Sequence, residues 1–434
     1  MSPRPSTPRE ISPSGALNAV VRVPGSKSLT NRAYLIAGLA NGTSEVTGGL
    51  VGDDSEAMIG ALRRLGCRVE EDSDALRITG RGGAFSRPDG PLDLRNSGTS
   101  ARFLTAAACL GEGPVVIDGN ARMRERPIGD LVDALTKLGA EAEIVGRDGC
   151  PPVRLAGGGM RGGEAGIDAS ASSQYVSAIL LAAPYAKSDV ALCFENGVLV
   201  SRPYVDLTLD IMRRFGADAE WIDESSLRVT SGQPYRARAY AVEADASAAV
   251  YPFCAAAIAG GRVRVEGIAK GSLQSDFRIL ELLERMGCRV ARGAGWAEVE
   301  GTPAGLSGID VDMNDLPDAA LALAVVALFA TGPTRLRNIW NLRIKETDRL
   351  AALETELRKL GADARADRDS LSIAPGPHRA ATIDTYDDHR LAMSFSLAGL
   401  RIPGVAIDDP GCVAKTWPDY WAAFDAMLAT GSRS

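Results

Sequence analysis

The sequence has few of the residues that metal centres and disulfide frameworks need. Only two histidines, His378 and His389, occur among 434 residues, which excludes a histidine-rich metal site. The seven cysteines are odd in number, widely spaced and without a Cys-x-x-Cys pair. A disulfide framework and a zinc site are therefore disfavoured, and reduced thiols in a cytoplasm fit best.

Long hydrophobic runs, aromatic residues and excess positive charge are also scarce. Aromatic residues make up 5% of the chain, and apolar stretches such as Ala319–Ala330 are too short to span a bilayer and suit buried helices. The net charge of −7 argues against a protein that coats nucleic acid. Residues Met1–Gly15 are rich in Pro and Ser and lack the apolar core of a signal peptide, so we expect a frayed tail.

In its other features, the composition is typical of a globular protein, and the length indicates more than one domain. Hydrophobic residues account for 45% and charged residues for 24%. A chain of 434 residues is too long for one compact core, so two domains are expected.

A helix-ending phrase of the type Leu-x-x-Leu-Gly recurs along the chain. Its glycines, at intervals of 71 to 77 residues, are Gly66, Gly139, Gly216, Gly287 and Gly361. Spacing this regular indicates structural repetition. About six such units fit the chain; five carry the phrase and the last has lost it. Units of about 70 residues are too long for a simple solenoid, so we expect three units in each of two domains.

The first copy shows what each unit contains. Residues Asp54–Leu65 have the apolar spacing of an amphipathic helix, with Arg63 and Arg64 in its last turn. Gly66 supplies a left-handed cap. A strand at 68–71, a turn at Asp72–Asp74 and a strand at 75–79 then form a hairpin, and similar hairpins are expected at 217–229 and 362–373.

Polar segments that no core requires lie outside the repeated phrase. Several place Ser, Thr, Asn or Gly at the start of an apolar helix, and others gather Lys and Arg; they are 24–32, 94–104, 122–129, 170–175, 201–204, 315–349, 385–390 and 414–418. Singly, each is explained by helix capping or by a solvated charged face. Together, with Asp318 and Glu346 among the cations, they indicate small substrates of several negative charges and acid–base chemistry.

Nine motifs in and around these segments, in this order, resemble the EPSP synthase family. They are PGSKSLTNR, NSGTSARF, RMRERPIGDLVDAL, SSQY, SRPY, LPDAA, NIWNLRIKETDRL, TYDDHRLAMSFSLAG and AKTWPDYW, and they cover Pro24 to Trp421. The resemblance implies an α/β (α+β) fold of two domains, each built from three βαβαββ units with buried helices. It implies one domain at 25–243 and another at 1–24 plus 244–434, with the active site in the interdomain cleft and closure on substrate.

The activity implied by the resemblance is transfer of the enolpyruvyl group of phosphoenolpyruvate to the 5-hydroxyl of shikimate 3-phosphate. Phosphate leaves, and 5-enolpyruvylshikimate 3-phosphate forms on the route to chorismate and the aromatic amino acids. The family is a glyphosate target; Phe103 stands where many members have Pro, which puts substrate and inhibitor affinity in question. No metal or organic cofactor, nucleic acid or membrane is implied, and we expect a cytoplasmic monomer.

The same resemblance assigns residues at matching positions. Shikimate 3-phosphate would be bound by Lys27, Ser28, Arg32, Ser172, Ser173, Gln174, Ser201, Tyr204, Asp318, Asn341 and Lys345. Phosphoenolpyruvate would be bound by Lys27, Gly98, Arg126, Gln174, Arg349, Arg390 and Lys415. Asp318 would accept the proton of the 5-hydroxyl, and either Glu346 or Lys27 would deliver the proton to the methylene carbon.

Three other functions are compatible with parts of the pattern. A transferase that acts on UDP-N-acetylglucosamine shares the fold and the donor, but has Lys-Asn where this chain has Lys27-Ser28, and a loop cysteine that Asn120–Arg124 lacks. A non-catalytic anion-binding protein would not need both Asp318 and Glu346. An RNA-end-processing enzyme is disfavoured by the acidic charge and the lack of a basic stripe.

Overall fold

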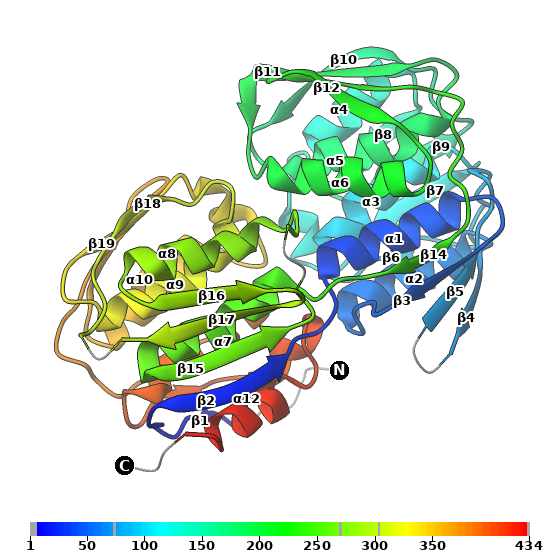
Figure 1. Ribbon diagram of the computed structural model, residues 1–434. Helices are drawn as coiled ribbons and strands as arrows, with labels where there is room; N and C mark the ends of the chain where they lie inside the picture. Colours follow the sequence, from blue (N-terminus) through cyan, green and yellow to red (C-terminus); the bar gives the residue numbers. More distant parts are fainter. Residues whose placement is uncertain (1–6, 73–74, 269–270, 303, 432–434) are drawn as a thin grey trace. The chain divides into compact units, whose positions relative to one another are not determined.

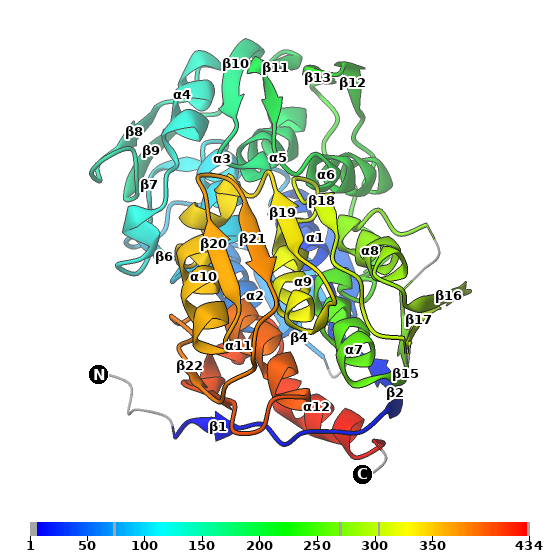
Figure 2. The same cartoon turned by 90° about the vertical axis from the view of Figure 1, so that its left-hand side faces the viewer.

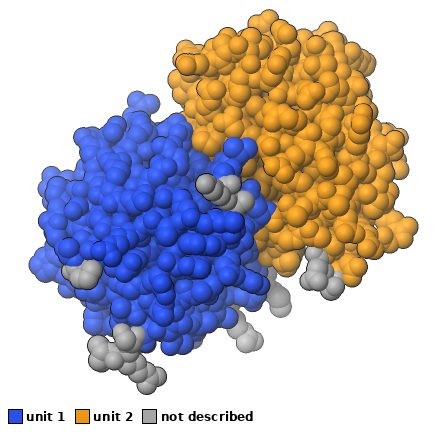
Figure 3. Space-filling view, viewed as in Figure 1, with its two compact units in different colours: residues 1–24, 243–434 blue, residues 25–242 orange. Residues whose placement is uncertain are grey.

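The computed structural model describes residues 7–72, 75–268, 271–302 and 304–431. The chain forms two compact units, coloured separately in Figure 3. Unit 1 comprises Met1–Pro24 and Glu243–Ser434, and unit 2 comprises Gly25–Val242. Each unit has its own hydrophobic core.

Unit 2 contains three four-stranded sheets, with the orders β14-β3-β5-β4, β6-β7-β9-β8 and β10-β11-β13-β12. Its strands are β3 (Thr43–Thr47), β4 (Arg68–Glu71), β5 (Ala75–Thr79), β6 (Leu92–Asp93), β7 (Glu112–Asp118), β8 (Ala142–Ile144), β9 (Val153–Gly157), β10 (Gly163–Ala169), β11 (Val190–Leu199), β12 (Ala219–Asp223), β13 (Ser226–Val229) and β14 (Ala239–Ala241). Its helices are α1 (Lys27–Leu39), α2 (Asp53–Arg64), α3 (Gly98–Ala108), α4 (Gly129–Lys137), α5 (Ser173–Ala182) and α6 (Pro203–Arg214), with 3₁₀ turns η1 (Met123–Glu125) and η2 (Ala183–Tyr185).

Unit 1 contains two sheets of the same kind, β16-β17-β15-β2 and β18-β19-β21-β20, and a smaller one, β1-β23-β22. Its strands are β1 (Arg9–Glu10), β2 (Leu17–Arg22), β15 (Gly261–Glu266), β16 (Arg289–Gly293), β17 (Trp296–Gly301), β18 (Asp310–Asp312), β19 (Thr334–Arg337), β20 (Asp363–Ala366), β21 (Leu371–Ala374), β22 (Thr382–Ile383) and β23 (Ala406–Ile407). Its helices are α7 (Ala246–Ala259), α8 (Ile279–Arg285), α9 (Ala320–Val326), α10 (Arg349–Lys359), α11 (His389–Ser396) and α12 (Tyr420–Leu428), with 3₁₀ turns η3 (Ser275–Arg278), η4 (Pro317–Ala319), η5 (Ala327–Phe329), η6 (Trp340–Ile344), η7 (Leu397–Leu400) and η8 (Pro410–Lys415).

The repeat expected from the sequence is confirmed. In each four-stranded sheet a parallel pair is followed by an antiparallel hairpin, as in β6, β7, β9 and β8. The five phrase glycines all have positive φ, between 81° and 109°, where a side chain would be strained. The sixth unit lacks the hairpin, and β1 pairs with β23 in its place.

Two strands lie just before the points where the chain passes from one unit to the other. Strand β2 leads into α1 of unit 2 but belongs to unit 1, where it pairs with β15, and β14 leads into α7 of unit 1 but belongs to unit 2, where it pairs with β3. The chain therefore crosses between units twice, at Pro24–Gly25 and Val242–Glu243.

The helices that carry the polar starts are buried within the units. Helix α1 is buried from Leu29 to Leu39, and every residue of α3 is buried. Figures 1 and 2 show the sheets around the outside of each unit and helices such as α1, α3, α5 and α9 inside them, whereas α12 lies on the outside of unit 1. A helix enclosed in this way is apolar all round, so polar side chains are expected at its ends.

Two expectations need correction. Residues 7–15 are not frayed: Arg9 and Glu10 form β1, Ile11 is buried, and the Arg9 guanidinium donates to Asp425 at 2.6 and 2.7 Å. The apolar stretch 319–330 is not one helix but η4, α9 and η5 in succession. The turn expected at Asp72–Asp74 falls partly outside the described residues.

Two of the apolar helices include part of the polar segment at their start. Helix α3 begins at Gly98 and α5 at Ser173. Small polar residues therefore occupy the first turns of these helices rather than the loops before them. Over the described residues, no helix combines the length and hydropathy that a membrane crossing would require.

Candidate functional site

The polar starts of α1, α3 and α5 lie together in unit 2. The Gln174 side-chain amide at the start of α5 donates to Thr99 at the start of α3, at 3.2 Å. The Arg32 guanidinium in α1 donates to the Ser177 hydroxyl in α5, also at 3.2 Å. The helices run side by side in Figure 1. Helix N-termini carry partial positive charge and unpaired N–H groups, so this end of the helix layer suits an anion.

Lys27 is the first residue of α1. Ser26 caps the helix by accepting the Leu29 N–H at 3.5 Å, so ordinary capping is part of what this motif does. The Lys27 ammonium is not simply solvated: its side chain is 14% exposed and lies 3.5 Å from the buried Asp54 carboxylate. Ser28 follows it and is half-buried.

Arg32 has a structural task that the sequence did not reveal. Its guanidinium donates to the hydroxyls of Thr208 and Ser177 and to the backbone carbonyls of Ser28 and Tyr204, at 2.8 to 3.2 Å. These bonds use four of its five N–H groups and join α1 to α5 and α6. Burial lowers its pKa to about 10, so it stays charged at neutral pH.

Gly98 and Arg126 are packed against each other. A methyl group placed on Gly98 would lie 2.5 Å from Arg126 Nη2. Of the three arginines in the 122–126 segment, Arg122 and Arg124 form exposed ion pairs with Glu125 and Asp118. Arg126 points inward: it is buried and donates to Asn96 at 3.3 Å, and its Nε finds no acceptor among the described residues.

The hydroxyls assigned at 172–204 lie at the starts of α5 and α6. Ser172 caps α5 by accepting the Gln174 N–H at 3.2 Å, and Ser173 is buried beside it. Ser201 is buried with a φ of 53°, and Tyr204 lies in the first turn of α6. A non-glycine residue in the left-handed region is uncommon and occurs often at functional sites.

Unit 1 holds five predicted site residues and Asp388 in one connected cluster, the carboxylate–arginine cluster (Asp318, Glu346, Arg349, Asp388, Arg390 and Lys415). Arg349, the first residue of α10, is 1% exposed and lies at its centre. It donates to Asp388 at 2.6 and 3.1 Å, and it contacts Asp318 at 3.0 Å and Glu346 at 2.9 Å.

Arg390 and Lys415 extend this cluster from two other elements. The Arg390 guanidinium, in the first turn of α11, contacts Asp318 at 2.9 Å and donates to the Tyr251 hydroxyl at 3.4 Å. The Lys415 ammonium, at the end of η8, lies 3.1 Å from Glu346. The Arg390 Nε finds no acceptor among the described residues. Each predicted carboxylate therefore contacts two of the predicted cations.

The carboxylates hold the arginines firmly in the charged state. Burial alone would lower the pKa of Arg349, but Asp388, Glu346 and Asp318 together raise it. Burial would also lower the pKa of Arg390, but nearby groups, chiefly Asp318, raise it well above its usual value. The cluster contains three carboxylates and three cations, so its charges balance. The carboxylates fix the positions of the cations, which can then bind a negatively charged substrate.

Asn341 and Lys345 stand beside this cluster on the segment that leads into α10. Asn341 is buried in η6, and its side-chain oxygen has no donor among the described residues. Lys345 directly follows η6 and is half-buried. A buried amide oxygen without a partner is unusual, so this oxygen is available to accept a hydrogen bond from a ligand.

Asp276 is a buried carboxyl group next to the cluster that sequence analysis did not single out. It accepts a hydrogen bond from the Ser247 hydroxyl. Burial, with smaller effects from Asp318 and Asp245 against Arg390, raises its pKa to about 6. Desolvation dominates this shift, because it penalises the charged form of the carboxyl group.

We expect Asp276→Asn to stabilise the protein more at pH 7.5 than at pH 4.5. The folded pKa of about 6 exceeds the ordinary aspartate pKa of 3.8, so the folded state binds more protons between these values and stability falls as pH rises. The substitution should therefore gain about 2 kcal/mol between pH 4.5 and pH 7.5. Urea unfolding of both proteins at the two pH values measures this, and an equal difference at both would contradict it.

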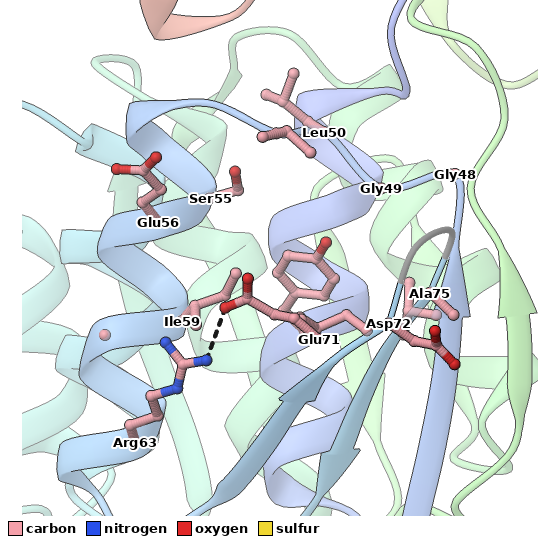
Figure 4. A pocket seen from close by; sticks show the side chains of 15 residues that line it. Gly48, Gly49, Leu50, Ser55, Glu56, Ile59, Arg63, Glu71, Asp72 and Ala75 are labelled. Atoms are coloured by element: carbon pink, nitrogen blue, oxygen red, sulfur yellow. Dashed lines mark hydrogen bonds and ion pairs between the residues drawn. The ribbon is translucent and has the colours of Figure 1, made fainter.

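The cavity of about 640 Å³ in unit 2 is separate from these residues. It lies between α2 and the hairpin β4–β5, and its walls include Ile59, Arg63 and Glu71 (Figure 4). The Arg63 guanidinium donates to Glu71 across it at 2.7 Å. No residue assigned to either substrate is among those that line this cavity. The cavity is therefore not part of the candidate site.

No group of three or more metal-ligating side chains occurs in the part of the chain that the structure describes. Sequence reasoning missed Asp54, Asp276 and Asp388. Asp54 lies in an acidic first helical turn, where a role in helix stability is the default interpretation. Asp388 precedes an apolar helix, and it does cap α11 by accepting the Arg390 N–H at 2.9 Å; its bond to Arg349 is not visible in sequence.

Solved structures share this architecture. An EPSP synthase from Acinetobacter baumannii superposes with a TM-score of 0.80 at 28% identity, covering 97% of this chain and 98% of that one. An enolpyruvyl transferase from Streptomyces tendae superposes with a TM-score of 0.79 at 20% identity, covering 98% of each chain, and shows the fold alone. The class that the architecture defines is that of the enolpyruvyl transferases.

Sequence comparison narrows the class to one family. The family model of EPSP synthase (3-phosphoshikimate 1-carboxyvinyltransferase) matches residues 11–424. A 3-phosphoshikimate 1-carboxyvinyltransferase of Marinomonas sp. (strain MWYL1) is 44% identical over 96% of this chain and 98% of its own length. One of Yersinia pseudotuberculosis serotype O:3 (strain YPIII) is 46% identical over 95% and 97%. The chain belongs to the EPSP synthase family.

Proposed function

We propose that this protein transfers the enolpyruvyl group of phosphoenolpyruvate to the 5-hydroxyl of shikimate 3-phosphate and releases phosphate. The observation that carries the proposal is the position of Asp318. Its two oxygens contact Arg349 at 3.0 Å and Arg390 at 2.9 Å. A carboxylate held between two arginines combines a proton acceptor with binding groups for an anion, and enolpyruvyl transfer needs both.

Each substrate carries a phosphate and a carboxylate, so several fixed cations are required. We assign shikimate 3-phosphate to the helix starts of unit 2, through Lys27, Ser28, Ser172, Ser173, Gln174, Ser201 and Tyr204, with Asp318, Asn341 and Lys345 from unit 1. We assign phosphoenolpyruvate to Lys27, Gly98, Arg126, Gln174, Arg349, Arg390 and Lys415. Guanidinium groups bind phosphate and carboxylate with paired hydrogen bonds.

Arg32 contributes to this binding through one remaining N–H group. Because its other four N–H groups bind within unit 2, its larger effect is to fix Ser28 and Tyr204. We therefore assign it chiefly as a residue that positions these two.

The reaction requires a base and an acid that act on different atoms. Asp318 accepts the proton of the 5-hydroxyl as that oxygen forms a bond to the enol carbon. The methylene carbon takes a proton from Glu346 or Lys27 and becomes a methyl group. The tetrahedral intermediate then loses phosphate as the carbon–oxygen bond breaks, and the methyl group gives up a proton to restore the double bond. The Lys415 ammonium lies 3.1 Å from the Glu346 carboxylate.

The same proposal has consequences for the cellular compartment, the partners and the oligomeric state of the protein. All seven cysteines are free thiols, which suits the reducing cytoplasm. Both substrates are small, so the proposal calls for no macromolecular partner, and we expect the monomer to be active.

Proton NMR of the reaction in D₂O tests the function. With phosphoenolpyruvate and shikimate 3-phosphate, we expect the vinyl signals of a new enol ether to appear in step with free phosphate. Deuterium should enter the methylene group, because the proton that it gains comes from an exchangeable side chain. Phosphate without an enol ether would instead indicate hydrolysis and would contradict the proposal.

A further inference from the structure

Helix α10 contains a buried carboxylate where the other copies of the repeat are apolar. Glu356 directly precedes Leu357 of the repeated phrase and is fully buried. The residues at this position in the other four copies are also buried and are Ala61, Ala134, Ile211 and Leu282. Packing of this helix in the repeat therefore does not require a carboxylate, and burying one is costly unless it is paired and hydrogen-bonded.

Glu356 is paired with the segment that leads into α11. One of its oxygens accepts the Tyr386 hydroxyl at 2.8 Å, and the other accepts the Asp384 N–H at 3.2 Å. The Lys359 ammonium, at 2.8 Å from Glu356, also reaches the Asp384 carboxylate at 2.9 Å. The buried carboxylate thus binds both the backbone and a side chain of residues 384–386.

The segment held in this way has an unfavourable backbone conformation. Tyr386 and Asp387 both have φ of 54°, and the Asp388 N–H donates to the Thr385 carbonyl at 2.9 Å. Two consecutive positive φ values are typical of turns built from Gly, Asn and Asp, and a Tyr there is an outlier. Such a conformation persists only where the surroundings support it, and two of the supporting hydrogen bonds are those to Glu356.

The turn ends at the residue that orients two arginines of the carboxylate–arginine cluster. Asp388 is fully buried and accepts Arg349 Nε and Nη2 at 2.6 and 3.1 Å. It also accepts the backbone N–H of Arg390 and so fixes the start of α11. A change in the turn would therefore displace Asp388, and through it both guanidinium groups.

We propose that Glu356, acting through Tyr386, is a positioning residue that sets the Arg349 and Arg390 geometry for phosphoenolpyruvate. This inference rests on the proposed function for the identity of the ligand. Glu356 touches neither Arg349 nor Arg390 directly, and its effect passes through residues 384–388. Its loss should weaken phosphoenolpyruvate binding while the acceptor site in unit 2 stays intact.

The test compares three single variants of the full chain. Glu356→Gln keeps the shape and removes the charge, Tyr386→Phe removes one hydroxyl, and Glu354→Gln is the control on the same helix, where Glu354 pairs only with Arg358 among the described residues. We expect KM for phosphoenolpyruvate to rise about tenfold in Glu356→Gln and about threefold in Tyr386→Phe. KM for shikimate 3-phosphate should stay within about twofold in both, and the control should match the parent protein.

The NMR resonance of the Arg349 Nε–H gives a readout that needs neither substrate nor turnover. It should shift in Glu356→Gln and Tyr386→Phe and stay in place in Glu354→Gln. If Glu356→Gln does not fold, Tyr386→Phe decides the matter. Unchanged resonance and unchanged KM would overturn the inference, as would an equal rise in both KM values. If the resonance shifts in these two variants but the parent protein transfers no enolpyruvyl group, the positioning role of Glu356 stands and the proposed function is rejected.

Discussion

Asp318→Asn is expected to lower kcat by a factor of about 10² to 10⁴, the range that a positioned general base contributes. The amide has nearly the shape of the carboxylate and cannot accept the proton of the 5-hydroxyl. Because Asp318 also contacts Arg349 and Arg390 at 3.0 and 2.9 Å, its neutralisation leaves more positive charge for an anion. KM for phosphoenolpyruvate should therefore stay the same or fall. Steady-state kinetics with both substrates separates the two effects.

Asp315→Asn is the matched control for this change. Asp315 lies three residues earlier on the same segment, and its side chain is 39% exposed and pairs with Arg278 at 2.9 Å. An exposed ion pair contributes little to stability, so this variant should keep the parent kcat. A kcat for Asp318→Asn within tenfold of the parent would exclude Asp318 as the base.

Gly98→Ala is expected to raise KM for phosphoenolpyruvate by about 10- to 100-fold. The added methyl group would lie 2.5 Å from Arg126 Nη2 and 2.8 Å from Arg102 Nη1, closer than real contacts allow. Both arginines are buried, and Arg102 is held by the carbonyls of Gly98 and Pro127. Arg126 must therefore shift. Losing one charge-assisted hydrogen bond costs about 1.5–3 kcal/mol, which corresponds to this range.

Gly60→Ala separates the effect of the methyl group from that of losing a glycine. Gly60 lies within α2, and a methyl group there would meet no atom within 4 Å. This variant should keep the parent KM and gain about 0.5–1 kcal/mol of stability, since Ala is the better helix former. A normal KM for phosphoenolpyruvate in Gly98→Ala would show that Arg126 does not bind this substrate.

The fold was largely accessible from sequence because its signals are local and repeated. The helix before Gly66, the glycine cap and the strands Arg68–Glu71 and Ala75–Thr79 all follow from periodicity and turn chemistry within about 25 residues. The pairing of β2 with β15 and of β14 with β3 does not follow from local signals, because partners that lie 244 and 194 residues apart leave no mark in either strand.

The residue types of the candidate site could be predicted from the sequence, but the contacts between these residues could not. Three arginines near position 126 are indistinguishable in sequence, yet only Arg126 is buried. Arg32 looks like a ligand for anions, but most of its donors bind within its own unit. Glu356 looks like part of a charged helix surface, and its burial depends on the turn 384–388, which only the folded chain brings to it.

Phosphate release from phosphoenolpyruvate, measured with each of two acceptors, tests the central claim most directly. We expect release with shikimate 3-phosphate, none with UDP-N-acetylglucosamine, and loss of release in Asp318→Ala. Release with the nucleotide sugar alone would assign the chain to a different acceptor. Binding of phosphoenolpyruvate without release under either condition would contradict the catalytic role of the carboxylate–arginine cluster.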